Sequence, residues 1–186
     1  FEHLGLKGDF SLRLLRTAFK RKVSGINLLF YGEPGTGKTE FCKVLSTYLG
    51  ALLLPVGETD EDGNEPSRTE RIQHLRLAQR MFAGQPKTLI LFDEMEDILP
   101  GPFHGFGSFA SGGISKVHMN RILERNTVPT LWTTNDIAGC DPAILRRMTF
   151  SIEMRRPSTR VRQKVWRRLA KNHNMKLDEQ TINRLA

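Results

Sequence analysis

The sequence predicts an α/β fold, a three-layer α/β/α sandwich in which helices cover both faces of a five-stranded parallel sheet. Five short apolar runs alternate with segments of helical spacing, which is the pattern of successive β-α-β units with right-handed crossovers. The first run, residues 26–31, is apolar except for Asn27, as expected for a parallel strand covered on both faces. A Gly-rich loop then separates this strand from a helix, which is the context of a phosphate-binding loop.

Local signals place the individual elements. The chain opens with an expected extended lead-in over residues 1–8. A helix follows, with Asp9 or Ser11 as its expected N-cap and its end near residues 24–25. We expect strands over residues 26–31, 51–56, 88–92, 130–134 and 150–154. The spacing indicates helices over residues 40–49, 67–82, 115–125 and 141–147, the last with Pro142 in its first turn.

The composition is that of an ordinary soluble globular protein, with 39% apolar and 26% charged residues. No apolar run approaches the roughly 20 residues that a bilayer-spanning helix needs, so we expect no membrane partner. Cys42 and Cys140 show neither metal-ligand spacing nor a disulfide framework, which favours a cytoplasmic location. The chain begins at Phe1 and ends within a helical pattern, so we expect it to be part of a longer protein.

The Gly-rich loop carries the strongest functional signal. Residues 32–39 fill every position of the pattern G-x-x-x-x-G-K-[ST]. Glycines let the loop turn its N–H groups towards an anion, and the helix N-terminus adds the positive end of its dipole. Lys38 would reach the β- and γ-phosphates, and Thr39 would bind Mg²⁺. We predict a nucleoside triphosphate site that includes Gly32, Glu33, Pro34, Gly35, Thr36, Gly37, Lys38, Thr39 and Glu40.

An acidic pair follows the third strand. Asp93 and Glu94 come at its carboxyl end, where parallel sheets bind ligands, so we expect Asp93 near Thr39. Because Mg²⁺ keeps several waters and takes few carboxylates, Asp93 and Thr39 form the predicted metal site. Glu94 is suited to orient and polarise the attacking water as a general base. The alternative is an acidic pair that only begins the next turn.

Polar residues between the fourth and fifth apolar segments complete the candidate site. Asn135 ends the fourth strand, where its amide would hold the lytic water or the γ-phosphate; alternatively it begins an Asn-Asp turn. Arg146 and Arg147 end the short helix that follows. Neither arginine easily reaches its own phosphate loop, but both are placed to face that of a neighbouring subunit.

Two loops have a distinctive composition. Residues 57–66 are acidic and contain glycine, which predicts an exposed loop. Residues 100–113 are rich in glycine and carry Phe103, Phe106 and Phe109 at three-residue intervals. This second segment either contacts a partner or a neighbouring subunit, or packs back on its own domain.

The formal net charge of +8 is unevenly distributed. The segment between Glu153 and Asp178 lacks acidic residues and holds Arg155, Arg156, Arg160, Arg162, Lys164, Arg167, Arg168, Lys171 and Lys176. This cluster is either a nucleic-acid or acidic-partner surface, or the solvated face of a helix whose apolar stripe is Val161, Val165, Trp166 and Leu169. No aromatic residues interleave on the basic face, so the solvated helix is favoured.

Together these motifs resemble those of the AAA+ ATPases, and more closely the AAA-type central domain. The resemblance covers residues 32–157 and implies a P-loop NTPase fold. Residues 32–39 look like Walker A, and residues 89–94 look like Walker B with Glu94 as the catalytic glutamate. Asn135 stands where the family has sensor 1. Arg147 is the first choice for the arginine finger and Arg146 the second, since the spacing is shorter than in the family's Arg-Pro-Gly-Arg form.

The resemblance also implies an architecture and a set of partners. Residues 1–157 would form the nucleotide-binding domain, with residues 1–4 lining the adenine pocket, and residues 158–186 would begin a small helical lid. A finger that acts in trans implies a homo-oligomer, a hexameric ring by analogy with the family. Two features depart from the pattern: residues 57–66 lack the aromatic-apolar-Gly motif of peptide-threading members, and the chain ends before the usual position of sensor 2.

The predicted function is therefore Mg²⁺-dependent binding and hydrolysis of ATP, with the energy used to remodel a macromolecular partner. One alternative is a nucleotide-gated switch or scaffold with little turnover. Another is a nucleic-acid-handling loader or motor that uses the basic segment after residue 153.

Overall fold

The computed structural model describes residues 5–57, 65–98 and 116–186. A five-stranded sheet lies at its centre, with the strand order β2-β3-β4-β1-β5 and every neighbouring pair parallel. Its strands are β1 (Asn27–Tyr31), β2 (Leu52–Val56), β3 (Thr88–Phe92), β4 (Thr130–Thr134) and β5 (Phe150–Glu153). The predicted parallel sheet is confirmed.

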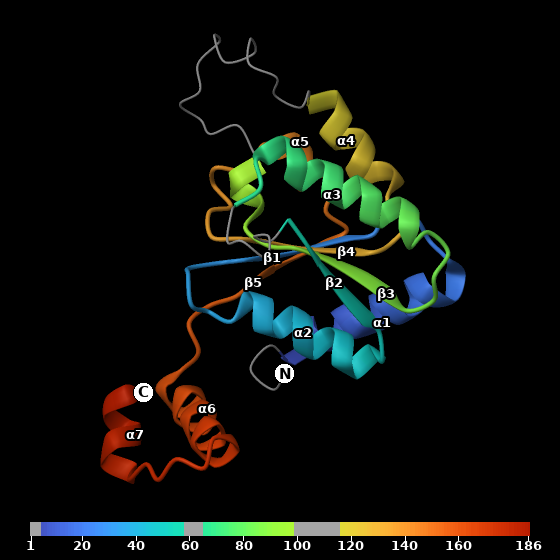
Figure 1. Ribbon diagram of the computed structural model, residues 1–186. Coiled ribbons are helices and arrows are strands. Elements are labelled where there is room, and N and C mark those ends of the chain that lie inside the picture. Colours follow the sequence, from blue (N-terminus) through green and yellow to red (C-terminus); the bar gives the residue numbers. More distant parts are fainter. Residues whose placement is uncertain (1–4, 58–64, 99–115) are drawn as a thin grey trace.

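Helices cover both faces of this sheet (Figure 1). On one face lie α1 (Gly5–Arg21) and α2 (Lys38–Leu49). On the other lie α3 (Arg68–Met81), α4 (Lys116–Arg125) and the short α5 (Pro142–Leu145), with a 3₁₀ helix, η1 (Met95–Ile98), directly after β3. The three-layer α/β/α sandwich predicted from the sequence is therefore confirmed.

The alternation of side chains along the strands produces two hydrophobic cores. On β1, Leu28 and Phe30 face α1 and α2, where they pack with Leu45, whereas Leu29 faces the opposite layer. There it joins Trp132 of β4 in a core with residues of α3, η1 and α4. Both faces of β1 are thus covered, and this explains why its sequence is almost uninterruptedly apolar.

Asn27, the one polar residue in that strand, is fully buried and organises the amino end of the sheet. Its Nδ2 donates to the carbonyl of Leu123 at 2.8 Å, and also to those of Gly25 and Arg147. Its Oδ1 accepts from Nε1 of Trp132 at 3.0 Å. A buried amide is stable here because its donors and acceptors all find partners.

Two helix starts differ from the prediction. The extended lead-in and the N-cap at Asp9 or Ser11 are wrong for the described part, because α1 already begins at Gly5. Ser11 lies inside the helix, where its hydroxyl donates to the Lys7 carbonyl at 3.0 Å. Gly8 and Ser11 are both buried, so packing outweighs the low helix propensity of glycine. Helix α2 begins at Lys38, two residues before the predicted start, because Gly37 serves as its N-cap.

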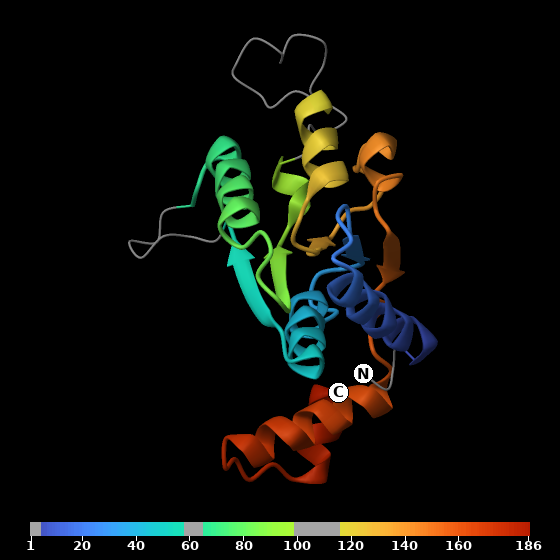
Figure 2. The ribbon, with the colours of Figure 1, turned by 90° about the vertical axis from the view of Figure 1, so that its right-hand side faces the viewer.

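The C-terminal segment forms two helices, α6 (Thr159–Asn172) and α7 (Glu179–Leu185), which lie apart from the sheet (Figures 1 and 2). Nε1 of Trp166 donates to the Leu185 carbonyl at 3.1 Å and joins the two helices. The predicted apolar stripe of α6 is only partly buried by the described residues, since Val165 is 49% and Leu169 40% exposed. The contact between α6 and α7 therefore does not bury the whole stripe.

Some predictions concern segments outside the described residues, namely the lead-in 1–4, most of the acidic loop 57–66 and the Gly-rich segment 100–113. Within the described residues, no helix combines the length and apolar character needed to cross a bilayer.

Replacing Asn27 with Leu should lower the free energy of unfolding by about 3 kcal/mol, because the indole N–H of Trp132 and the Leu123 carbonyl lose their buried partner. Urea unfolding followed by circular dichroism measures this change. The same substitution at the exposed Asn172 should change the free energy by no more than about 0.5 kcal/mol. Equal effects at the two positions would contradict the role assigned to Asn27.

Candidate active site

The loop between β1 and α2 has the backbone of a phosphate cradle. Gly32, Gly35 and Gly37 have φ values of 145°, 77° and 86°, a region that residues with a Cβ rarely adopt. A Cβ on Gly32 would lie 2.3 Å from the Met154 carbonyl oxygen, so no larger residue fits there. Gly37 caps α2 without a side-chain hydrogen bond, which leaves the first N–H groups of that helix available to an anion.

Lys38 is buried beneath this loop. Its Nζ donates to the carbonyls of Gly32 at 2.8 Å and Glu33 at 3.0 Å, and to Oδ1 of Asn135 at 2.7 Å. Burial lowers the pKa of Lys38, and the nearby carboxylates of Glu96, Asp93 and Glu94 act in the opposite direction. Residues predicted from two separate motifs, Lys38 and Asn135, are thus in direct contact.

Asp93 joins the end of β3 to the start of α2. Oγ1 of Thr39 donates to Oδ2 of Asp93 at 2.8 Å, and Oγ1 of Thr133 donates to Oδ1. The carboxylate and hydroxyl oxygens are hard donors of the kind that Mg²⁺ prefers. No group of three or more His, Cys, Asp or Glu side chains suited to a metal occurs among the described residues. The donor set fits Mg²⁺ held by one carboxylate, one hydroxyl, waters and phosphate oxygens.

Glu94 has an exposed side chain and an unusual backbone. Its φ is 52°, in the left-handed region, and its N–H donates to Oγ1 of Thr133 at 3.0 Å. The hydroxyl of Thr133 therefore contacts both members of the acidic pair, because it donates to Asp93 and accepts from Glu94. Sequence reasoning missed Thr133, although its position two residues before Asn135 on the same strand was a usable signal.

Glu96 is a second residue that sequence reasoning missed. It lies in η1, where its Oε1 accepts from the backbone N–H of Asn135 at 2.9 Å. Its Oε2 is buried and makes no hydrogen bond to any described residue. Glu96 is also the carboxylate with the largest effect on the Lys38 pKa. A third acidic residue two positions after Glu94 was the available signal in the sequence.

The two candidate finger arginines lie in different environments. Arg147 is half-buried; its Nε pairs with Oε1 of Glu124 at 2.7 Å, and its Nη1 donates to the Ala143 carbonyl at 2.6 Å. Arg146 is exposed, and its Nε donates to the Pro142 carbonyl at 3.3 Å. These contacts lie on α4 and α5, so the structure does not bring either guanidinium into the Lys38–Asp93 cluster.

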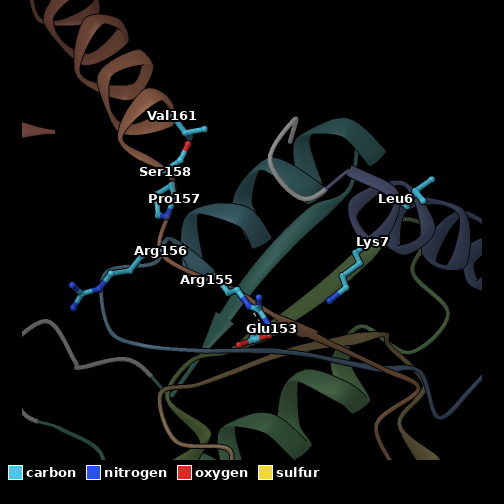
Figure 3. Close-up of a pocket in the computed structure, with 8 residues that line it drawn as sticks. All are labelled: Leu6, Lys7, Glu153, Arg155, Arg156, Pro157, Ser158 and Val161. Carbon is cyan, nitrogen blue, oxygen red and sulfur yellow. Dashed lines mark hydrogen bonds and ion pairs between the residues drawn. The ribbon is translucent and has the colours of Figure 1, made fainter. Parts of the chain in front are cut away.

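A cavity of about 560 Å³ lies between the start of α1 and the segment that connects β5 to α6 (Figure 3). It is lined by Leu6, Lys7, Glu153, Arg155, Arg156, Pro157, Ser158 and Val161. Arg156 connects this cavity to the phosphate loop, because its Nε pairs with Oε2 of Glu33 at 2.7 Å. The two features therefore lie next to each other.

Comparison with known proteins agrees with this geometry. Residues 28–156 match the family described as "ATPase family associated with various cellular activities (AAA)". The chain belongs to the AAA family of ATPases. This membership confirms the resemblance read from the motifs and the predicted enzyme class, an ATPase.

Two relatives show how similar the chain is to individual proteins. The chain is 30% identical over 151 residues to a protein named as a 26S proteasome regulatory subunit homolog of Methanocaldococcus jannaschii, covering 78% of this chain and 39% of the relative. It is 26% identical over 168 residues to the replication factor C large subunit of Nanoarchaeum equitans, covering 88% and 35%. The chain thus spans between a third and two fifths of the length of these relatives.

A solved structure shows the same fold. The AAA domain of FIGL-1, in complex with ADP, superposes with a TM-score of 0.67 at 20% sequence identity. The matched region covers 97% of this chain and 63% of that one.

Replacing Lys38 with Met should weaken binding of a fluorescent ATP analogue about 10- to 100-fold, because a hydrogen bond to a charged group contributes about 1.5–3 kcal/mol. Fluorescence titration measures the dissociation constant. Lys43→Met is the matched control, since Lys43 lies on the same helix but is exposed and pairs with Glu40. Equal affinity in the two variants would remove Lys38 from the nucleotide site.

Proposed function

We propose that this chain is the ATP-binding and ATP-hydrolysing module of a protein that remodels a macromolecular partner. The observation that carries the proposal is one hydrogen-bonded cluster, in which Lys38 contacts Asn135 and Thr39 contacts Asp93. These side chains come from three separate segments, and all of them were predicted for one site. The donors and acceptors present are those that triphosphate hydrolysis needs.

Nucleotide binding begins with Lys38. Its Nζ would exchange the carbonyls of Gly32 and Glu33 for the β- and γ-phosphate oxygens, which are charged and form stronger hydrogen bonds. The same exchange would release Oδ1 of Asn135 from Lys38. The Asn135 amide is then available to the γ-phosphate or to the lytic water, while Glu96 keeps its backbone in place.

The chemical step needs charge neutralisation and an activated water. Thr39 and Asp93 would hold Mg²⁺, which neutralises charge on the phosphate oxygens when bound. Glu94 would act as the general base, since its side chain is exposed beside this cluster and free to approach a water. Asp93 is not suited to that role, because both of its oxygens accept hydrogen bonds from threonines.

We place the adenine base of the nucleotide in the cavity between α1 and the β5–α6 segment (Figure 3). It is adjacent to the phosphate loop through the Arg156–Glu33 ion pair, and it is large enough for a nucleoside. A nucleotide that occupies both would contact the α/β layers and the start of α6. This arrangement supports the proposed division into a nucleotide-binding domain over residues 1–157 and a helical lid that begins at residue 158.

Assembly would complete the site. We place the arginine finger at Arg146 rather than at Arg147, the first choice from the sequence. Arg147 already pairs with Glu124 in its own subunit, so presenting it to a neighbour would break that ion pair. Arg146 is exposed at the adjacent position, and it forms no ion pair with any residue that the structure describes. A finger acting in trans implies a homo-oligomer, and the proposed form is a hexameric ring.

A second candidate function is the handling of nucleic acid. The observation that favours it is the basic surface of α6, where Arg160, Lys164 and Arg168 are exposed. Three archaeal relatives are named as replication factor C large subunits. This candidate requires DNA or RNA affinity whose logarithm falls linearly with the logarithm of salt concentration. Absent or salt-independent binding would eliminate it.

Replacing Glu94 with Gln should leave the affinity for ATP within about twofold and lower kcat by about 10²- to 10⁴-fold, because the general base is lost. Steady-state phosphate release, measured against protein concentration with Mg²⁺ and with excess EDTA, tests this. Glu179→Gln, an exposed change on α7, is the control. Release that is negligible in the unchanged chain despite ATP binding would instead favour a nucleotide-gated switch.

Replacing Arg146 with Ala should lower kcat about 10³-fold or more without changing the affinity for ATP, because a finger stabilises only the transition state. Arg147→Ala should lower the rate much less. Mixing Arg146→Ala chains with Glu94→Gln chains should restore phosphate release, since each type supplies what its neighbour lacks. A mixture as inactive as its components would contradict a finger in trans.

A further inference from the structure

The backbone of Glu94 lies in a conformation that it does not adopt unaided. A φ of 52° is costly for a residue with a Cβ, and glutamate lacks the short polar side chain with which Asn or Asp stabilises this region. Such strain persists only where the surroundings impose it. The contacts that impose it also determine where the Glu94 side chain begins.

Two side chains hold this turn from opposite sides. From β4, Oγ1 of Thr133 accepts the Glu94 N–H at 3.0 Å. From α3, Arg71 reaches the two carbonyls: its Nη2 donates to the Asp93 carbonyl, and its Nη1 lies 3.5 Å from the Glu94 carbonyl, the outer limit of a hydrogen bond. The peptide that joins Asp93 to Glu94 is therefore fixed by groups from two layers of the fold.

Arg71 is itself held in place. It is 9% exposed, and its guanidinium carbon lies 4.8 Å from the centre of the Phe92 ring, in cation–π geometry. Gly57 also lies close to it, since a Cβ at that position would be 2.9 Å from Nε of Arg71. A planar guanidinium can stack on a ring and donate in its own plane at the same time, whereas an ammonium group cannot.

We propose that Arg71 is a positioning residue for the hydrolysis step, which sets the backbone of Asp93 and Glu94 so that the Glu94 carboxylate reaches the attacking water. This inference rests on the proposed role of Glu94 as general base. Arg71 contacts neither nucleotide nor metal in this scheme. It acts on this turn through its hydrogen bonds to the main chain, from a helix outside both sequence motifs.

The test compares Arg71→Met and Arg71→Lys with the unchanged chain, at protein concentrations where phosphate release per chain has reached its plateau. Met keeps apolar contact with the Phe92 ring but donates no hydrogen bond. Lys keeps the positive charge but lacks the planar guanidinium with its paired N–H donors. We expect Arg71→Met to lower kcat by about 10- to 100-fold, the effect of a displaced catalytic group, with the affinity for ATP within about twofold. The kcat of Arg71→Lys should lie between that of the unchanged chain and that of Arg71→Met. Arg80→Met, an exposed change on the same helix, is the control.

Two further measurements distinguish a positioning role of Arg71 from a role in stabilising the fold as a whole. Hydrogen exchange of the Glu94 amide should be faster in Arg71→Met, while exchange in the centre of β1 and β4 stays unchanged. Millimolar methylguanidinium should partly restore kcat in Arg71→Ala, measured well below its melting temperature, whereas tetramethylammonium should not.

Full kcat in Arg71→Met would overturn the inference, and so would an equal loss of kcat and of ATP affinity, or equally accelerated exchange throughout the sheet. Failure of the proposed function is distinguishable. If the unchanged chain hydrolyses no ATP, or Glu94→Gln hydrolyses it normally, the general-base role falls and this inference falls with it. If Glu94→Gln is inactive and Arg71→Met is not, only the inference is wrong.

Discussion

The lateral order of β3, β4 and β1 is the constraint on which the candidate site depends. The three strands are parallel neighbours, with Tyr31 paired to Thr134 and Phe92 paired to Trp132. Their carboxyl ends therefore meet at one edge, where the phosphate loop, the Asp93–Glu94 pair and Asn135 each follow a strand. The hydrophobic cores on both faces keep these strands from shifting, so the polar groups at the edge are attached to a rigid sheet.

A buried cation balances that edge electrostatically. Lys38 is surrounded by loop carbonyls and by three carboxylates, and burial alone would favour loss of its proton. The three carboxylates act in the opposite direction on the Lys38 pKa. Conversely, Lys38 lies close enough to Glu96 to offset part of the cost of burying that carboxylate.

The same region stores backbone strain at Glu94, whose φ of 52° lies in the left-handed region. Thr133 restrains two consecutive residues of this turn, since its one hydroxyl donates to Asp93 and accepts from the N–H of Glu94. Arg71 supplies the opposing contact from α3. Strained residues held by more than one contact are common where a catalytic group needs a defined direction. In this chain the restraint comes from ordinary packing residues, which no motif includes.

The sequence by itself determined the number of strands and their positions along the chain, the phosphate loop and the acidic pair of this AAA ATPase. Those features depend on local information, such as apolar runs, glycines with positive φ and a strand that ends in Asp93. The sequence also placed Asp93 near Thr39, a contact that the structure shows, whereas the tertiary structure alone decided the other long-range contacts. Glu96 contacts the Asn135 backbone, Arg71 contacts the Asp93–Glu94 turn, and Glu124 pairs with Arg147. These pairings depend on how layers pack over long chain separations, and neither periodicity nor spacing encodes such contacts.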